Sequence, residues 1–243
     1  MKSEKYLIIS DIHNKVDKAQ EIIDNIPHDK VIFLGDYFDS FHDNASDAYN
    51  TACWLKKSLM NPNHIFVYGN HDSPYRYSHD QGWIWCPGWD EYKQKRIKEV
   101  LTLDDWDKIK YYHRIGDWLF SHAGAHKRYF THPIKGFSLD RVEEVCKEAK
   151  EHANMGLNHP LFRYGERMGM EGPGGIFWMD WEQFEPIENV NQVIGHSPDL
   201  LPRKKNEKNS QNYCLDTHLK HYGIFQDGKF DSYDVRTNKK VKL

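Results

Sequence analysis

The sequence predicts an α/β fold formed by a single domain of 243 residues. Over residues 6–69, short apolar runs alternate with amphipathic segments in the order strand, helix, strand, helix, strand. This order implies parallel strands joined by right-handed crossovers. Strand-like runs return in the later part of the chain, and no internal repeat or linker divides it. A chain of this length can bury a sizeable core in one domain.

The elements expected in the first part of the chain have clear ends. We expect strands at residues 6–10, 31–35 and 65–69, and helices at residues 16–26 and 46–60. Pro27 closes the first helix and Pro62 follows the second, because proline cannot continue a helix.

The later part of the chain carries two long interruptions. We expect an aromatic, loop-rich insertion at about 73–110 and a long loop containing Gly and Pro at about 154–186. The remaining expected elements are a helix at 139–152 and strands at 118–121, 190–195, 212–215, 223–225 and 230–235. The last two strands are joined by a hairpin turn at Gln226-Asp227-Gly228-Lys229, since Asp-Gly is typical of such turns. Arg203-Lys204-Lys205 is expected to be a solvated connection, or less readily a contact for an anionic substrate.

Composition excludes several classes of protein. The net charge of −3 and the pI near 6.6 give no basic field for nucleic acid or anionic membranes. No apolar run reaches 18 residues, and the start of the chain lacks the apolar segment of a signal peptide. The widely spaced cysteines argue against a disulfide framework or a thiolate zinc site. These cysteines are Cys53, Cys86, Cys146 and Cys214. We therefore expect a soluble, cytoplasmic protein.

Polar side chains follow five of the expected strands. These segments are Asp11-Ile12-His13, Gly35-Asp36-Tyr37-Phe38-Asp39, Gly69-Asn70-His71-Asp72, Ser121-His122-Ala123-Gly124 and Gly195-His196-Ser197-Pro198. In an open α/β sheet the carboxyl ends of the strands face one crevice, so these side chains can converge. Carboxylate, amide oxygen and neutral imidazole are ligands for divalent metals. A second Asp-x-His, at Asp216, comes late in the chain, and we leave it outside the site.

In these five blocks, over about residues 6–198, the chain resembles the calcineurin-like metallophosphoesterases. The blocks Ser-His-Ala-Gly and Gly-His-Ser-Pro, with Phe177-Trp178-Met179-Asp180 between them, are most similar to the branch of Ser/Thr protein phosphatases and diadenosine tetraphosphate hydrolases. Leu215-Asp216-Thr217 resembles a late strand of that branch. The resemblance implies a four-layer αββα sandwich, in which helices flank two mixed β-sheets. It also implies two divalent metal ions, with Mn favoured and Fe, Zn, Co or Ni as alternatives.

The resemblance further implies a role for each site residue. Asp11, His13 and Asp36 would hold the first ion, and Asp36, Asn70, His122 and His196 the second, with Asp36 bridging. A metal-bridging hydroxide would attack phosphorus in line. His71 would protonate the leaving oxygen as general acid, and Asp72 or another carboxylate would fix its tautomer. Asn70 would also contact the substrate.

Two features depart from the pattern of that branch. Ser40 and Phe41 stand where Arg-Gly usually follows the second aspartate, so the arginine that grips the phosphate is missing. Arg163 and Arg167, in the long loop, are candidates to replace it because an arginine fork matches phosphate oxygens. A solvated charged loop is an equally open interpretation. Gly-His-Ser-Pro also lacks the second histidine that many phosphodiesterase members carry.

The insertion after His71 is crowded with aromatic residues. They are Tyr75, Tyr77, Trp83, Trp85, Trp89 and Tyr92. They could stack a nucleobase or form a small satellite core, and the core is slightly favoured. We expect a phosphorylated small molecule, leaning to a nucleotide-type phosphoester, with a phosphoprotein as the alternative. A non-catalytic scaffold of the same fold is disfavoured because every expected ligand position is filled.

Taken singly, each site residue has an ordinary structural alternative. Asp11 could cap a helix, Asp36 and Asp39 could be turn residues, and His122 could be a satisfied core histidine. Asn70-His71 and His196 could belong to simple turns. Asp39 is expected to be structural or to support a neighbour rather than to act in catalysis. Together, these alternatives require five coincidences in the order of one family.

Overall fold

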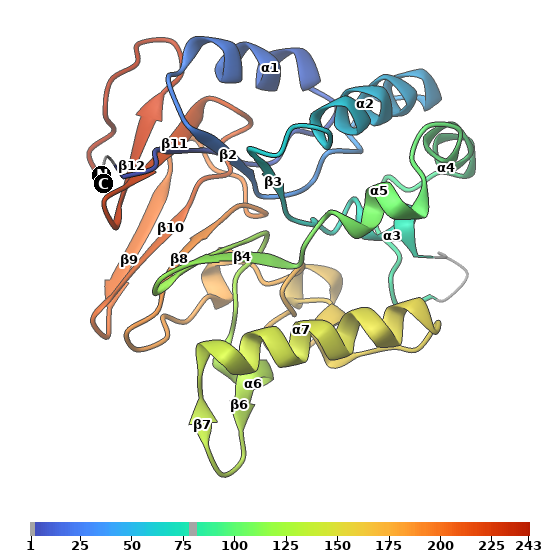
Figure 1. Cartoon of the computed structure of the whole chain (residues 1–243). Helices are drawn as coiled ribbons and strands as arrows, with labels where there is room; N and C mark the ends of the chain where they lie inside the picture. The colour runs from blue at the N-terminus through green and yellow to red at the C-terminus, as the bar shows by residue number, and fades with distance from the viewer. Residues whose placement is uncertain (1–2, 78–81) are drawn as a thin grey trace.

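A mixed sheet of five strands forms one half of the molecule in the computed structural model, which describes residues 3–77 and 82–243 (Figure 1). Its order is β12-β11-β1-β2-β3, with the strands spanning Lys229–Asp234, His221–Gln226, Tyr6–Ile9, Lys30–Phe33 and His64–Phe66. The strands β1, β2 and β3 are parallel, whereas β11 is antiparallel to both of its neighbours. The parallel strands and crossover helices expected over residues 6–69 are therefore confirmed.

A second mixed sheet packs face to face against the first. Its order is β4-β5-β8-β10-β9, with the strands spanning Tyr112–Ile115, Trp118–Ser121, Asn191–Ile194, Ser210–Cys214 and Arg203–Glu207. The three central strands are parallel, and the two edge strands run antiparallel to them. The side chains between the sheets are apolar: Phe225 of the first sheet lies 5.3 Å, ring centre to ring centre, from both Trp118 and Phe120 of the second.

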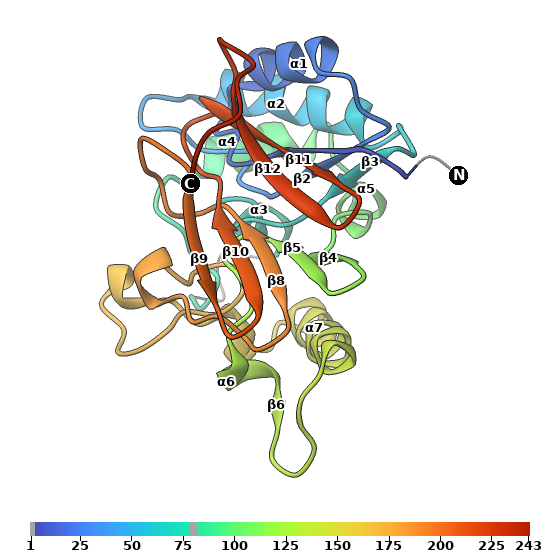
Figure 2. The same cartoon turned by 90° about the vertical axis from the view of Figure 1, so that its left-hand side faces the viewer.

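Helices cover the outer face of each sheet, which completes four layers (Figures 1 and 2). The helices α1 (Val16–Asn25) and α2 (Ala45–Ser58) pack on the first sheet through one continuous apolar cluster. The helix α7 (Leu139–Asn154) lies over the second sheet. The expected αββα sandwich is confirmed, and its carboxyl strand ends open towards one edge. No helix in the described ranges is both long enough and apolar enough to span a membrane.

The local sequence explains where α2 begins and how the chain turns from β11 to β12. Asn44 caps α2 and forms a reciprocal capping box with Asp47. The turn between β11 and β12 has positive φ angles at Asp227 (53°) and Gly228 (69°). Two consecutive left-handed residues match the twist of a hairpin, so the expected Asp-Gly turn is confirmed.

The insertion contains more helix than the sequence indicated. Its short helices are α3 (Ser73–Arg76), α4 (Glu91–Lys98) and α5 (Leu103–Asp107). The sequence of α4, EYKQKRIK, is almost entirely polar, so it shows no apolar period, but Asp90 caps its first turn. The long loop contains the short 3-10 turns η2 (Pro160–Phe162), η3 (Glu166–Met168) and η4 (Trp181–Gln183).

The edge strands were also missed. Arg203-Lys204-Lys205 is not a solvated connection: it begins β9, which pairs antiparallel with β10. Charged residues are usual on exposed edge strands, where they discourage pairing with another chain. The strand β4 pairs with β5 across the turn at Gly116. A small hairpin, β6 (Thr131–His132) and β7 (Gly136–Phe137), follows α6 (Lys127–Phe130) and projects from the molecule (Figure 1).

Candidate active site

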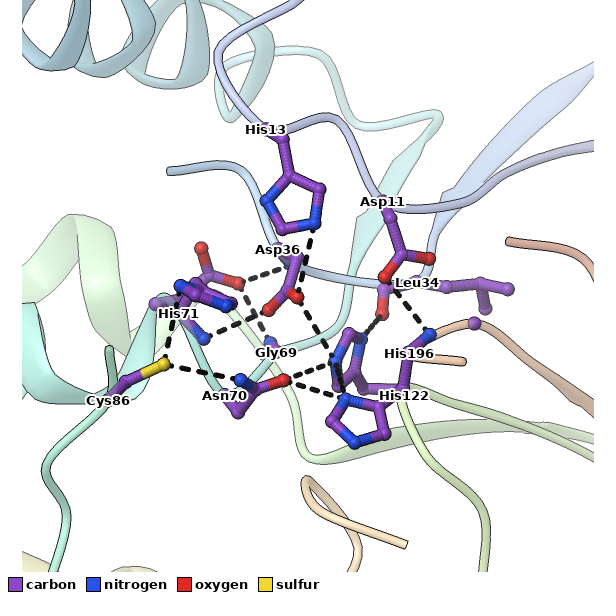
Figure 3. Close-up of polar contacts among 12 residues, drawn as sticks. Asp11, His13, Leu34, Asp36, Gly69, Asn70, His71, Cys86, His122 and His196 are labelled. Carbon is purple, nitrogen blue, oxygen red and sulfur yellow. Dashed lines mark hydrogen bonds and ion pairs between the residues drawn. The ribbon is translucent and has the colours of Figure 1, made fainter. Parts of the chain in front are cut away.

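Two groups of metal-ligand atoms meet at the carboxyl ends of the central strands (Figure 3). The first contains Asp11, His13 and Asp36, and the second contains Asp36, His122 and His196. Within each group the donor atoms lie within 4.8 Å of one another. The two groups share Asp36, so the structure brings together side chains that are up to 185 positions apart in the chain.

The second group also includes the amide oxygen of Asn70. Oδ1 of Asn70 lies 2.8 Å from Nε2 of His122 and 2.8 Å from Nδ1 of His196. Nδ1 of His122 lies 2.8 Å from the carbonyl oxygen of Leu34, so Nδ1 carries the proton and donates it. Nε2 of His122 therefore presents a lone pair to the oxygen of Asn70. Two facing acceptors repel unless they share a cation, so this donor set fits a metal ion.

Contacts with backbone groups also orient the side chains of the first group. Nδ1 of His13 lies 2.6 Å from the backbone oxygen of Asp39 and donates to it, while Nε2 lies 3.7 Å from Oδ2 of Asp36. Oδ1 of Asp11 accepts a hydrogen bond from the backbone N–H of His196 at 3.0 Å. That bond ties the end of β1 to the end of β8 and joins the two groups.

Tight turns at the strand ends aim these side chains at one point. His13, Asp36 and His196 all have positive φ angles, of 48°, 53° and 68°. This conformation is uncommon for non-glycine residues, and histidine and aspartate are among those that adopt it most often. Gly69 and Gly195 leave room for the ligands, because a methyl group on either would overlap the carboxylate of Asp36 or Asp11.

Burial sets the electrostatics of the site. Desolvation raises the pKa of Asp11, and desolvation together with the charges of Asp11 and Asp72 raises the pKa of Asp36 well above its usual range. Desolvation lowers the pKa of His122 to about 3 and that of His196 well below its usual value. The site therefore combines crowded acidic groups with neutral imidazoles. Divalent cations would relieve this crowding.

Of the carboxylates considered for His71, the structure places Asp39 rather than Asp72 beside the ring. Its Nδ1 lies 3.1 Å from Oδ2 of Asp39, and its backbone N–H donates to Oδ1 of Asp36 at 2.9 Å. The carboxylate of Asp72 faces away from the ring and accepts 2.8 Å hydrogen bonds from the backbone N–H groups of Asp36, Tyr37 and Gly69. Asp72 thus fixes the turn after β2, and Asp39 takes the orienting position. Asp72 was the first candidate because it adjoins His71 in the chain.

One of the two candidate arginines reaches the centre. Nη2 of Arg167 lies 2.6 Å from Nε2 of His196 and 2.6 Å from Oδ1 of Asp180. The guanidinium of Arg163 instead donates to the backbone oxygen of Glu171 and lines a neighbouring cavity of about 560 Å³. The segment Phe177-Trp178-Met179-Asp180 thus supplies the carboxylate that holds Arg167.

Asp216 lies closer to the centre than we expected. Its side chain is buried, and desolvation together with the charge of Asp11 raises its pKa to about 7. It is absent from both ligand groups found among the described residues. The sequence signals for it were a second Asp-x-His and the resemblance of Leu215-Asp216-Thr217 to a late strand of the family branch, and its late position concealed the proximity.

The aromatic residues of the insertion divide between core and surface. Tyr75 and Tyr77 are buried in the main apolar cluster, and Trp83 and Trp89 pack against it, so these rings extend the main core rather than form a separate satellite core. Trp85 and Tyr92 are exposed. Trp83 lines the 560 Å³ cavity and lies 5.2 Å from the ring of Phe162. Only Trp83 of this set therefore contributes a ring to that cavity.

The chain matches a known protein family over most of its length: the family model of calcineurin-like phosphoesterases matches residues 4–223. No curated protein matches the chain in sequence. Among solved structures, a cold-active protein tyrosine phosphatase of the psychrophile Shewanella sp. is similar, with a TM-score of 0.61 and 14% identity over 98% of this chain and 80% of that chain. A protein Ser/Thr phosphatase of Saccharomyces cerevisiae gives a TM-score of 0.52 and 12% identity over 92% and 72% of the two chains. At such identities the likeness shows the shared fold alone.

Proposed function

The chain belongs to the calcineurin-like phosphoesterase family of hydrolases, and on that premise we propose that it is a dinuclear-metal-dependent enzyme acting on a nucleotide-type phosphoester. The observation that carries the proposal is the pair of ligand groups that share Asp36. A shared carboxylate allows two cations to lie close together despite their repulsion. Asp11 and His13 would complete the first site, and Asn70, His122 and His196 the second.

The metal ions would supply an activated water nucleophile and neutralise charge on the phosphoryl oxygens. Mn is the first candidate, and Fe, Zn, Co and Ni accept the same mixed oxygen and nitrogen ligands. Burial keeps His122 neutral, and its Nδ1 donates to Leu34, so the lone pair on Nε2 stays available for binding.

His71 is the group that would protonate the leaving oxygen. Nδ1 of the ring donates to Oδ2 of Asp39 at 3.1 Å, and this carboxylate favours the imidazolium form, whose second proton lies on Nε2 and would pass to the leaving oxygen. The ring lies 5.2 Å from the ring of His13, beside the first ligand group. A proton donor at this place matters most when the leaving group is a poor one.

Arg167 would bind the phosphate in place of the arginine that the sequence lacks after Asp39. Its guanidinium already lies at the second ligand group, and Asp180 holds it there. An arginine fork can form two hydrogen bonds to phosphate oxygens. Asn70, whose side chain faces both His122 and His196, would contact the same substrate group.

The neighbouring cavity supports the nucleotide-type substrate. Trp83, Phe162 and Tyr164 give it aromatic faces, Arg128 and Arg163 give it positive charge, and no described carboxylate lines it. Its volume of about 560 Å³ is typical of sites for small ligands. The ring of Tyr164 lies 4.9 Å from Trp178, which in turn lies 5.9 Å from His196, so two ring contacts link the cavity to the ligand group. A flat, anionic leaving group would suit it, whereas a phosphopeptide remains the alternative occupant.

The test is a side-by-side substrate panel with Mn²⁺. It contains dinucleoside polyphosphates, mononucleotides, cyclic nucleotides, bis-p-nitrophenyl phosphate and phosphopeptides. We expect the nucleotides to be the best substrates, and EDTA to abolish their hydrolysis. Trp83→Ala should raise KM for them, whereas Trp85→Ala, outside the cavity lining, serves as the matched control. If phosphopeptides alone are hydrolysed, the nucleotide assignment is wrong; if no ester is hydrolysed, the proposed activity is wrong.

A further inference from the structure

The insertion after His71 buries a lysine against the carboxylate that orients that histidine. Nζ of Lys93, in α4, lies 3.1 Å from Oδ1 of Asp39 and 2.8 Å from Oδ1 of Asp43. It also donates to the backbone oxygen of Gly88 at 2.8 Å. These three contacts satisfy all three N–H donors of an ammonium group. The side chain of Lys93 is only 8% exposed, so this is a specific internal pairing rather than a surface ion pair.

Lys93 and Tyr75 together determine which oxygen of Asp39 faces the histidine. The hydroxyl of Tyr75 donates to Oδ1 of Asp39 at 2.6 Å, and Lys93 contacts the same oxygen. Oδ2 is left to engage Nδ1 of His71. A buried carboxylate that loses its cation keeps a large desolvation cost, which it can reduce by moving or by taking up a proton. Either response would disturb the ring of His71.

The residues just before α4 also lie against His71, Asn70 and Asp39. Sγ of Cys86 lies 3.3 Å from Nδ1 of His71 and 3.3 Å from Nδ2 of Asn70. Gly88 has a φ of +99°, and a methyl group on it would lie 3.1 Å from Cβ of Asp39. The insertion therefore touches the histidine, its carboxylate and one of the candidate ligands. By contrast, Phe41, two positions after Asp39 in the chain, is 97% exposed and does not form part of this packing.

We propose that Lys93 is a positioning residue for proton donation by His71, acting through Asp39. The insertion thereby brings a cation to the Asp39 carboxylate from a different part of the chain. This inference rests on the proposed function, in which His71 protonates the leaving oxygen. Among the residues that the structure describes, Lys93 contacts no candidate metal ligand directly, so its loss should weaken proton donation far more than metal binding.

The experiment compares Lys93→Met and Lys93→Arg on two esters with Mn²⁺. One ester has a poor alkoxide leaving group, and the other is p-nitrophenyl phosphate, whose leaving group departs without a proton. General acids contribute about 10²–10⁴-fold, so we expect Lys93→Met to lose at least about tenfold in kcat on the alkyl ester and much less on the aryl ester. Lys93→Arg should recover part of the loss. Lys108→Met is the matched control, because Lys108 belongs to the same insertion but forms a more exposed ion pair with Asp105.

A double-mutant comparison separates positioning from general destabilisation. In a His71→Ala background, Lys93→Met should cause no further loss on the alkyl ester, because the group that it positions is already absent. Equal losses on both esters, or an undiminished loss in that background, would overturn the inference. If Lys93→Met fails to fold, Lys93→Gln, which keeps a hydrogen-bond donor, undergoes the same comparison. A wild-type protein inactive on both esters would overturn the proposed function as well, whereas an active wild type unaffected by the substitution overturns the role of Lys93 alone.

Discussion

Oδ2 of Asp39 lies 3.1 Å from Nδ1 of His71, and this contact fixes the face that the imidazole ring turns to the metal ligands. Because Nδ1 donates its proton to Asp39, the second proton of the imidazolium form lies on Nε2, where it is available to a leaving group. The backbone N–H of His71 donates to Asp36, the carboxylate that the two ligand groups share. The candidate proton donor and the candidate bridging ligand are therefore joined by a hydrogen bond between the turn after β3 and the turn after β2.

Replacement of His71 by alanine should slow the hydrolysis of an alkyl phosphate much more than that of an aryl phosphate. We expect turnover of an alkyl phosphate to fall by about 10²–10⁴-fold, because its alkoxide cannot leave without a proton. Turnover of p-nitrophenyl phosphate should fall much less. The measurement is kcat on both esters at saturating Mn²⁺, with metal content checked in parallel. Equal losses would remove His71 from the role of acid.

Arg167 should contribute to substrate binding rather than to metal binding. A hydrogen bond to a charged group contributes about 1.5–3 kcal/mol, so Arg167→Met should lower kcat/KM by roughly ten- to a hundredfold. Arg163 does not reach the ligand groups, and Arg163→Met is the control for the loss of a loop charge. Steady-state kinetics on a small phosphate ester distinguishes the two variants. Similar effects from both would contradict the assignment.

Buried carboxyl groups should contribute less to the stability of the metal-free protein as the pH rises from about 4 to about 8. Desolvation raises the pKa of Asp72 and of Asp216 to about 7, above the values in an unfolded chain. Such groups hold their protons more tightly when folded, so their contribution to stability is present at low pH and is lost as the pH passes through 7. The buried histidines oppose this trend up to about pH 7.5, because unfolded histidine is half-protonated at about pH 6.5 whereas burial lowers the pKa of His122 and His196 in the fold. Asp216→Asn removes one carboxyl group and keeps these histidines, so comparison with it isolates the carboxyl contribution.

Thermal melting of the protein in EDTA and in Mn²⁺ tests this expectation. In EDTA, the Tm of the wild type relative to that of Asp216→Asn should decrease over that pH range, whereas bound cations should offset the carboxylate repulsion in the wild type and remove most of this decrease. A relative Tm in EDTA that stays constant or rises with pH would show that the acidic groups are not crowded as the structure indicates.

The candidate ligands could be predicted from the sequence because their positions follow from strand ends. Asp11, Asp36 and His122 each come directly after an apolar run, and the carboxyl ends of neighbouring parallel strands must meet. The apolar runs also predicted the helix–strand order, since α1 and α2 bury one face each.

Residues that act through contacts between distant segments could not be predicted in this way. Asp39 and Lys93 are 54 positions apart, and Lys93 lies on a helix with almost no apolar period. Asp72 adjoins His71 in the chain, yet successive side chains in a tight turn point in different directions. Asp39, from the turn after β2, therefore contacts the ring of His71 instead. The edge strand β9 was missed because exposed edges favour the same charged residues as loops.

The central claim is that Asp36 serves two metal ions at once. Its most direct test is anomalous diffraction from crystals soaked in Mn²⁺, supported by metal analysis of the wild type and of Asp36→Asn. We expect two ions per chain, one also contacting Asp11 and His13 and the other also contacting Asn70, His122 and His196, with fewer than two ions retained by Asp36→Asn. A single ion, or two ions of which neither contacts Asp36, would contradict the account.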